Sequence, residues 1–121
     1  MANTPTVIAY AGDAIKVSIT VLQTSGAVLD LTGITVIEYA LATAPGAAPL
    51  VTKTLAGGGI SVSAPTTGVF VVSLVEADTS TLVTGNSPVV FYQEALLVDT
   101  SGDPVTVYSG YILLYPTSLK A

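Results

Sequence analysis

Acidic side chains are the residues of this chain best suited to acid–base catalysis. The sequence has eight Asp and Glu residues but no His and no Cys. It therefore lacks the commonest general base, the commonest neutral metal ligand and any thiol nucleophile. A pair of carboxylates can still hydrolyse glycosides, and Glu38 and Glu94 are the best candidates because both fall within predicted strands. An exposed strand position explains both glutamates equally well, so we expect no catalytic residue and no enzyme activity.

Asp99, Ser101 and Asp103 have the spacing that begins a calcium-binding loop. No bidentate acid completes such a loop, because residues 104–108 contain no carboxylate. A tight hairpin turn uses the same residue types to bind backbone N–H groups, and we favour that interpretation over a structural cation. Gly57-Gly58-Gly59 also indicates a turn, since no Lys-Ser or Lys-Thr follows it to form a phosphate loop. We therefore expect no metal and no cofactor.

Charged side chains are scarce and mostly acidic. They make up 9% of the 121 residues, against about a quarter in a typical domain. The net charge is −5, and the three cations Lys16, Lys53 and Lys120 are scattered, so the sequence predicts no nucleic-acid binding. Hydrophobic residues account for 50%, yet the longest charge-free stretch, 54–75, contains Pro65 and four glycines and predicts no membrane-spanning helix. The N-terminus has no basic region before its apolar residues, which argues against a secretory signal.

The elements that must position these residues are predicted to be strands. In Ile15–Val21 apolar residues alternate with Lys16, Ser18 and Thr20, which is the pattern of a half-buried strand. Further strands are predicted over 34–42, 50–55, 60–63, 69–75, 89–98 and 105–115, and a single helical turn over 76–82, capped by Asp78 or Thr79. The expected fold is one domain over residues 1–121, an immunoglobulin-like antiparallel β-sandwich of seven or eight strands with short N- and C-terminal arms. The residues expected in its interior are Ile15, Val17, Ile19, Val21, Val69, Val71 and Leu96.

The combination of few charges and many apolar residues predicts that other subunits cover much of the surface. The arms, residues 1–9 and 115–121, are the expected contact segments because they are short and nearly uncharged. The six tyrosines fit packing at the edge of the core, subunit contact or a sugar-stacking platform, in that order of preference. Tyr111 and Tyr115 share strand parity, whereas Tyr108 points the opposite way. The interface candidates are Val7, Tyr10, Tyr111, Tyr115 and Leu119.

Several strand-and-turn motifs resemble those of a known family. They are Gly12-Asp13, Leu29-Asp30-Leu31-Thr32-Gly33, Thr79-Ser80-Thr81-Leu82, the run from Gln93 to Gly102, the run from Thr106 to Tyr111, and Pro116-Thr117. In this order they resemble the small immunoglobulin-like domains of structural proteins of tailed bacteriophages, such as capsid decoration proteins and baseplate or fibre-attachment domains. The resemblance covers residues 10–117 and brings no catalytic residue with it.

The resemblance implies a non-enzymatic role in a virion, made in the host cytoplasm, with other virion structural proteins as partners. Fibre and baseplate proteins usually continue into a host-binding domain, and the chain's ending at Ala121 favours a capsid decoration or cement protein over a tail, baseplate or fibre adaptor. We expect a homo-oligomer or a multi-copy array, with no nucleic acid and no membrane among its partners. A carbohydrate-binding adhesive module is the rival from another functional class.

Overall fold

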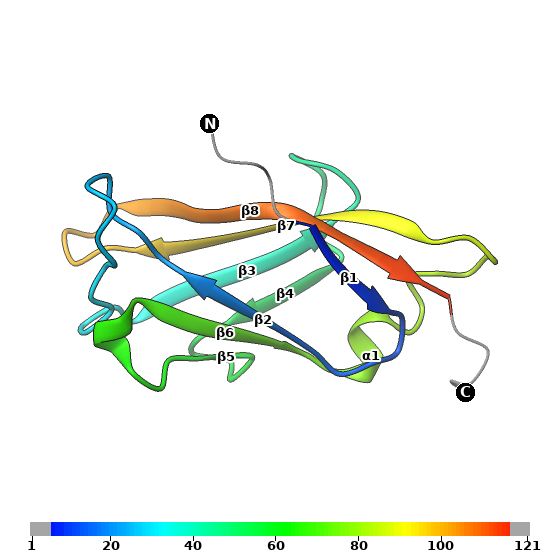
Figure 1. Cartoon of the computed structure of the whole chain (residues 1–121), viewed down its shortest axis with the longest axis horizontal. Coiled ribbons are helices and arrows are strands. Elements are labelled where there is room, and N and C mark those ends of the chain that lie inside the picture. The colour runs from blue at the N-terminus through cyan, green and yellow to red at the C-terminus, as the bar shows by residue number, and fades with distance from the viewer. Residues whose placement is uncertain (1–5, 117–121) are drawn as a thin grey trace.

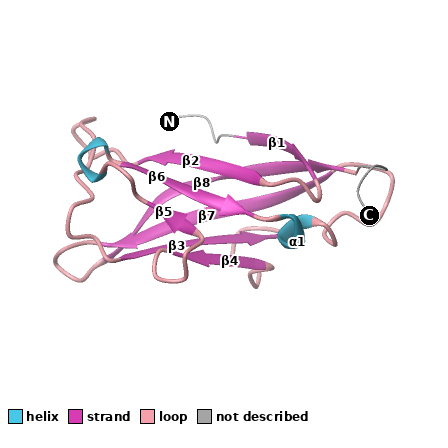
Figure 2. Cartoon of the chain, turned by 90° about the horizontal axis from the view of Figure 1, so that it is seen from below, coloured by secondary structure: helices cyan, strands magenta, loops and turns pink. Residues whose placement is uncertain are grey.

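The protein folds into two β-sheets packed face to face, as Figures 1 and 2 show for the described residues, 6–116, of the computed structural model. The five-stranded sheet has the order β1-β8-β7-β3-β4 and the three-stranded sheet the order β2-β6-β5. The strands are β1 (Thr6–Tyr10), β2 (Ile15–Thr20), β3 (Val36–Ala42), β4 (Val51–Thr54), β5 (Ile60–Ser61), β6 (Val69–Leu74), β7 (Val89–Val98) and β8 (Pro104–Tyr115). A 3-10 turn, η1 (Pro65–Thr67), precedes β6, and one helical turn, α1 (Glu76–Thr79), follows it. The predicted all-β sandwich is confirmed.

The strand order is that of an immunoglobulin-like sandwich. The trio β2-β6-β5 forms one sheet, while β3, β7 and β8 form the other with β4 added at its edge, as in variable-type domains. Most neighbouring strands are antiparallel, but β1 runs parallel to β8. The predicted sandwich is thus antiparallel except for this one pair, whose strand β1 was not predicted.

The N-terminal arm is shorter than predicted, because part of it is strand β1. Its backbone pairs Thr6 with Tyr111 and continues to Tyr10 with Tyr115. Apolar residues occur on both faces of this short segment, so its sequence shows no alternation from which a strand could be recognised. Tyr115 is likewise the last residue of β8 and not part of an arm. Residues 1–5 and 117–121, with the interface candidate Leu119, lie outside the described residues.

The core lies between the sheets, and β2 contributes to it as predicted. Ile15, Val17, Ile19 and Val21 are all buried. The predicted parity of β6 and β7 is wrong. The buried side chains there are Phe70, Val72 and Leu74 of β6 and Phe91, Gln93, Ala95 and Leu97 of β7, whereas the expected core residues Val69, Val71 and Leu96 are half-buried and point outward. These strands carry apolar residues on both faces, so hydrophobicity alone does not specify their inner face.

A hydrogen-bonded chain of polar side chains crosses this core. The Tyr39 hydroxyl donates to Gln93 Oε1 at 2.6 Å, and Gln93 Nε2 donates to the Tyr108 hydroxyl at 3.0 Å and to the Tyr111 carbonyl at 3.3 Å. Gln93 is 0% exposed and Tyr39 is 1% exposed. No buried side-chain polar atom within residues 6–116 lacks a partner, so the network satisfies its own hydrogen-bonding groups.

This network makes the fold sensitive to alkaline pH. Burial, and secondarily the nearby Tyr108 phenol, raises the pKa of Tyr39, so the folded protein holds this proton more tightly than the unfolded chain does. That contribution to stability is present below about pH 10, where an exposed tyrosine begins to ionise, and is lost as the pH rises further. We expect the free energy of unfolding in denaturant to fall above about pH 10, with a shallower fall in Tyr39→Phe. Equal slopes in the two proteins would contradict this assignment.

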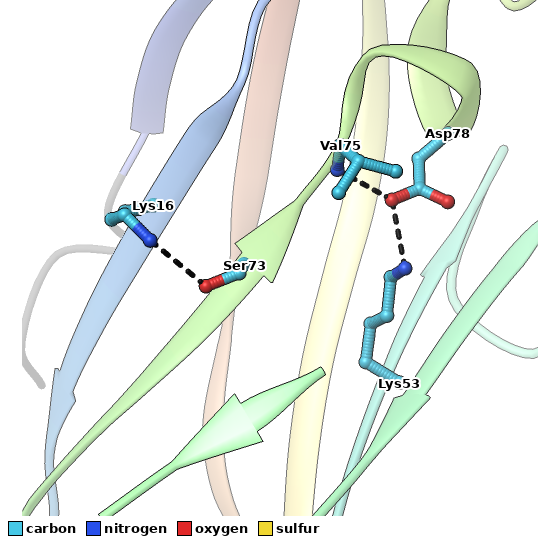
Figure 3. Close-up of polar contacts among 5 residues, drawn as sticks. All are labelled: Lys16, Lys53, Ser73, Val75 and Asp78. Atoms are coloured by element: carbon cyan, nitrogen blue, oxygen red, sulfur yellow. Dashed lines mark hydrogen bonds and ion pairs between the residues drawn. The ribbon is translucent and has the colours of Figure 1, made fainter. Parts of the chain in front are cut away.

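Polar contacts hold the chain around α1, as Figure 3 shows. Asp78 Oδ2 accepts a hydrogen bond from the Val75 N–H at 2.7 Å and lies 2.8 Å from Lys53 Nζ. This ion pair links β4 of one sheet to the segment that follows β6 of the other. Thr79 Oγ1 accepts from the buried Gly12 N–H at 2.9 Å, which ties α1 to the turn before β2. The predicted helical turn is confirmed, but Asp78 and Thr79 bind amides that precede the helix in sequence, not those that follow.

The β7–β8 hairpin closes with the predicted tight turn. Asp99 Oδ1 accepts hydrogen bonds from the N–H groups of Ser101 and Asp103, both at 2.9 Å. Gly102 adopts a φ of 89°, which a glycine reaches without strain. Nowhere in residues 6–116 do three His, Cys, Asp or Glu side chains gather where they could hold a metal ion. The Asp99 carboxylate stabilises the turn through its two hydrogen bonds.

Candidate docking face

The outer face of the five-stranded sheet is the candidate functional site, and we call its outward-pointing side chains the docking face. Side chains alternate across a strand, and most of the inward set is buried or half-buried, so the outward set of β1, β8, β7, β3 and β4 forms one continuous surface. Its most exposed apolar members are Ile8 at 66%, Val90 at 53%, Tyr10 at 52% and Val36 at 38%. The docking face is thus largely apolar although it lies on the outside of the sandwich.

The outer face of the three-stranded sheet has a different chemistry. Its outward residues on β2 are Lys16, Ser18 and Thr20, and Ser61 and Ser73 extend this polar surface over β5 and β6. Lys16 Nζ donates to Ser73 Oγ at 3.2 Å across the β2–β6 pair (Figure 3). The two valines of β6 that share this face are only half-buried, but polar neighbours surround them. Of the two sheet faces, the docking face is the one suited to dry protein contact.

Tyrosine rings pair on the docking face. Tyr10 of β1 lies 5.7 Å from Tyr115 of β8, with their rings tilted by 43°. Tyr92 of β7 lies 5.7 Å from Tyr111 of β8 in an edge-on arrangement at 66°. The structure therefore brings the candidates Tyr10, Tyr111 and Tyr115 to one surface.

One interface candidate from the sequence does not lie on the docking face, and three members of the docking face were not predicted. Val7 points inward and packs against the core. Ile8, Val90 and Tyr92 were not among the predicted interface residues. The signal that could have identified them was the absence of polar alternation in β1 and β7, because strands with one solvated face usually alternate.

A groove of about 540 Å³ opens on the docking face over β3, β4 and β7. Its walls include Tyr92, Leu96 and the loop of residues 42–49, and it contains both Glu38 and Glu94. In the strand register Ala40 lies opposite Glu94 and Glu38 lies opposite Leu96, so the two glutamates are diagonal neighbours on one face. Burial raises the pKa of Tyr92, and so do the charge and hydrogen bonding of the neighbouring Glu94.

The pair of glutamates proposed from sequence as catalytic candidates therefore meets in one groove. Glycoside hydrolysis needs two carboxyl groups on opposite sides of the scissile bond. Glu38 and Glu94 stand as diagonal neighbours on adjacent strands of the same sheet. Two carboxylates on one surface can also bind a positively charged group.

No helix within residues 6–116 is long and apolar enough to cross a membrane. A scan against protein-family models finds no match to the chain, and a search of curated proteins finds no relative.

Proposed function

We propose that the protein is a non-enzymatic structural subunit of a tailed-bacteriophage virion, present in many copies and docked on other virion proteins through the docking face. A capsid decoration or cement role is the leading form of this proposal, and a tail, baseplate or fibre adaptor is its variant. The observation that carries it is the exposure of Ile8, Tyr10, Val36 and Val90 on one sheet face. The motif resemblance to phage immunoglobulin-like domains supplies the virion context.

Docking removes side chains of the docking face from water, and the free energy of this step depends on whether they are apolar or charged. Apolar side chains gain free energy when they are removed from water, at about 25 cal/mol per Å² of apolar surface. The tyrosine rings add large apolar area while their hydroxyl groups bind water or a partner. Among the described residues, Glu38 and Glu94 are the charged side chains on the outward faces of β3 and β7, so few ions must be desolvated when a partner docks. An adhesive carbohydrate module is less well supported, because the edge-on Tyr92–Tyr111 pair does not form a flat platform.

Mass spectrometry of purified particles tests the virion assignment. Particles are prepared from a strain that carries the gene, heads and tails are separated, and copy number is measured relative to the major capsid protein. We expect many copies per particle in the head fraction. Detection only in tails would select the adaptor variant, and absence from both fractions would refute the proposal.

One pair of variants tests the docking face itself. Val90→Glu places a charge in the middle of the apolar surface, and we expect it to lower incorporation into particles roughly tenfold or more, because an unpaired charge is costly to bury in an interface. Thr20→Glu places the same charge on the exposed outer face of β2 and serves as the matched control. Circular dichroism checks that both variants keep the β-fold. Equal incorporation of the two variants would exclude the docking face as the contact surface.

A further inference from the structure

Strand β1 is an edge strand that lacks the usual protection against pairing with another chain. Proteins protect exposed sheet edges with very short strands, charged side chains or proline. Among the other edge strands described, β5 is two residues long, β4 contains Lys53 and β2 contains Lys16. β1 is five residues long, contains no charge, glycine or proline, and lies at the border of the molecule in Figure 2. Of the described edges, β1 is therefore the one best suited to accept a further strand.

The free side of β1 carries backbone groups that no described strand pairs. β1 runs parallel to β8, and the Ala11 N–H donates to the Tyr115 carbonyl at 3.0 Å. Alternate residues of a strand direct their backbone groups to opposite sides, so those of Ala9 face β8 whereas those of Ile8 and Tyr10 face away from it. The side chain of Ile8 is 66% exposed, so nothing described covers this edge at its centre. The edge thus offers donors and acceptors for strand addition.

We propose that β1 pairs antiparallel with β1 of a second copy of this chain, about a two-fold axis at Ile8. This register sets Ile8 opposite the partner's Ile8 and Thr6 opposite the partner's Tyr10, which allows about six backbone hydrogen bonds between the strands. The Tyr10 carbonyl accepts the Asp13 N–H at 3.2 Å and retains a second lone pair for this contact. The inference rests on the proposed function, since it names one contact of a protein present in many copies.

The residues of β1 are complementary to themselves in this register, which favours a second copy as the occupant. Val7 and Ala9 point inward and are half-buried, and the register sets the larger Val7 opposite the partner's smaller Ala9. On the outer face the exposed Ile8 packs against the partner's Ile8, and apolar pairs of this kind stabilise a sheet. Because β1 contains no charged residue, the two strands bring no like charges together. One segment therefore supplies both halves of a closed, symmetric contact.

Pairing through β1 would join the docking faces of the two copies. Each copy contributes its five-stranded sheet, and residues opposite each other in an antiparallel pair point to the same side. The two docking faces then form one apolar surface over the joined sheet. A five-residue strand pair is small beside the roughly 1,200–2,000 Å² of a standard interface, so we expect weak association of the isolated protein. Binding of both copies to one particle surface would strengthen it.

Single-cysteine variants of the full-length chain test the register, because the sequence contains no other Cys. An antiparallel hydrogen-bonded pair places opposite Cα atoms about 5.5 Å apart, within the roughly 4.4–6.8 Å that a disulfide spans. Ile8→Cys should therefore form a disulfide-linked dimer roughly tenfold faster under mild oxidation than Ser18→Cys does. Ser18 is exposed in the middle of β2, the other long edge strand, and serves as the matched control. Equal rates for the two variants would overturn the proposed pairing.

Sedimentation velocity tests the same contact without a covalent link. We expect a monomer–dimer equilibrium for the wild type, and Ile8→Lys should raise its dissociation constant roughly tenfold or more because two lysines then lie opposite each other. Ser18→Lys adds the same charge to β2 and should leave association unchanged. Circular dichroism checks the β-fold of both variants. A wild type that stays monomeric at millimolar concentration, or a dimer equally stable in Ile8→Lys, would exclude pairing through β1.

The outcomes separate this inference from the proposed function. If the wild type is monomeric but Ile8→Lys still lowers incorporation into particles, the β1 edge accepts a strand of another virion protein and self-pairing is wrong. If self-pairing fails and Val90→Glu prevents incorporation, the docking face contacts another virion protein and the proposed function stands. If both tests of β1 behave as expected but the protein is absent from particles, the pairing stands and the virion role falls.

Discussion

Replacing Gln93 with Leu is expected to lower the free energy of unfolding by about 2–4 kcal/mol, since a buried polar group that loses its partner costs about 1–3 kcal/mol. Leu is similar in size to Gln but cannot accept the hydrogen bond that the Tyr39 hydroxyl donates at 2.6 Å. It also removes the donor to Tyr108 and to the Tyr111 carbonyl. Tyr39 is 1% exposed, so water cannot replace the lost partner. Equilibrium denaturation in urea measures the loss.

A double-mutant cycle distinguishes the hydrogen bond from simple packing. Tyr39→Phe leaves Gln93 Oε1 without its donor, whereas Tyr39→Phe combined with Gln93→Leu removes both polar groups. Because two apolar groups of similar shape leave nothing unsatisfied between them, we expect the double variant to be more stable than the sum of the single losses predicts. Additive losses would show that the Tyr39–Gln93 bond contributes little and that the core depends on volume alone.

The fold class could be predicted from the sequence because strands with one solvated face, such as β2, alternate clearly between apolar and polar residues. In β2, ions and hydroxyls separate Ile15, Val17 and Ile19, and each of these three residues is buried as expected. In β7 the run from Ala95 to Val98 is apolar throughout, so periodicity cannot choose between Leu96 and Leu97. The structure buries Leu97 and turns Leu96 into the groove. The ambiguity has a physical origin, because the outer face of this strand is mostly apolar and Glu94 is its charged member.

The same reasoning explains how much of the candidate site could be predicted. Tyr111 and Tyr115 were placed on one face from their even spacing, and the structure sets them beside Tyr92 and Tyr10. The partners could not be predicted, because they come from strands far away in sequence whose register is fixed by tertiary pairing. Glu38 and Glu94 were paired only as the acids that lie in strands. Their meeting in one groove depends on the β3–β7 register, which the sequence does not display.

Replacing Gly68 with Ala is expected to destabilise the fold by about 2–5 kcal/mol, through left-handed backbone strain and crowding against fixed neighbours. Gly68 lies between η1 and β6 with a φ of 71°. A Cβ there would lie 2.8 Å from the Leu29 carbonyl oxygen and 3.1 Å from the Val21 carbonyl oxygen. The Gly68 carbonyl also accepts the Val21 N–H at 2.8 Å, so the backbone cannot retreat without losing this bond.

Gly26 provides the matched control for this substitution, because it also has a positive φ, 92°, but no atom lies within 4 Å of the position that an added Cβ would occupy. Gly26→Ala is therefore expected to cost only the conformational strain, about 1–2 kcal/mol. The difference between the two losses measures the close approach of the Leu29 and Val21 backbones to β6. Since that approach holds the 22–33 loop against the start of β6, Gly68→Ala should also speed hydrogen exchange of the Leu29 amide, which donates to the Val21 carbonyl at 2.9 Å. Equal losses in the two variants, with unchanged exchange at Leu29, would show that the loop yields to the methyl group and that Gly68 serves only its backbone conformation.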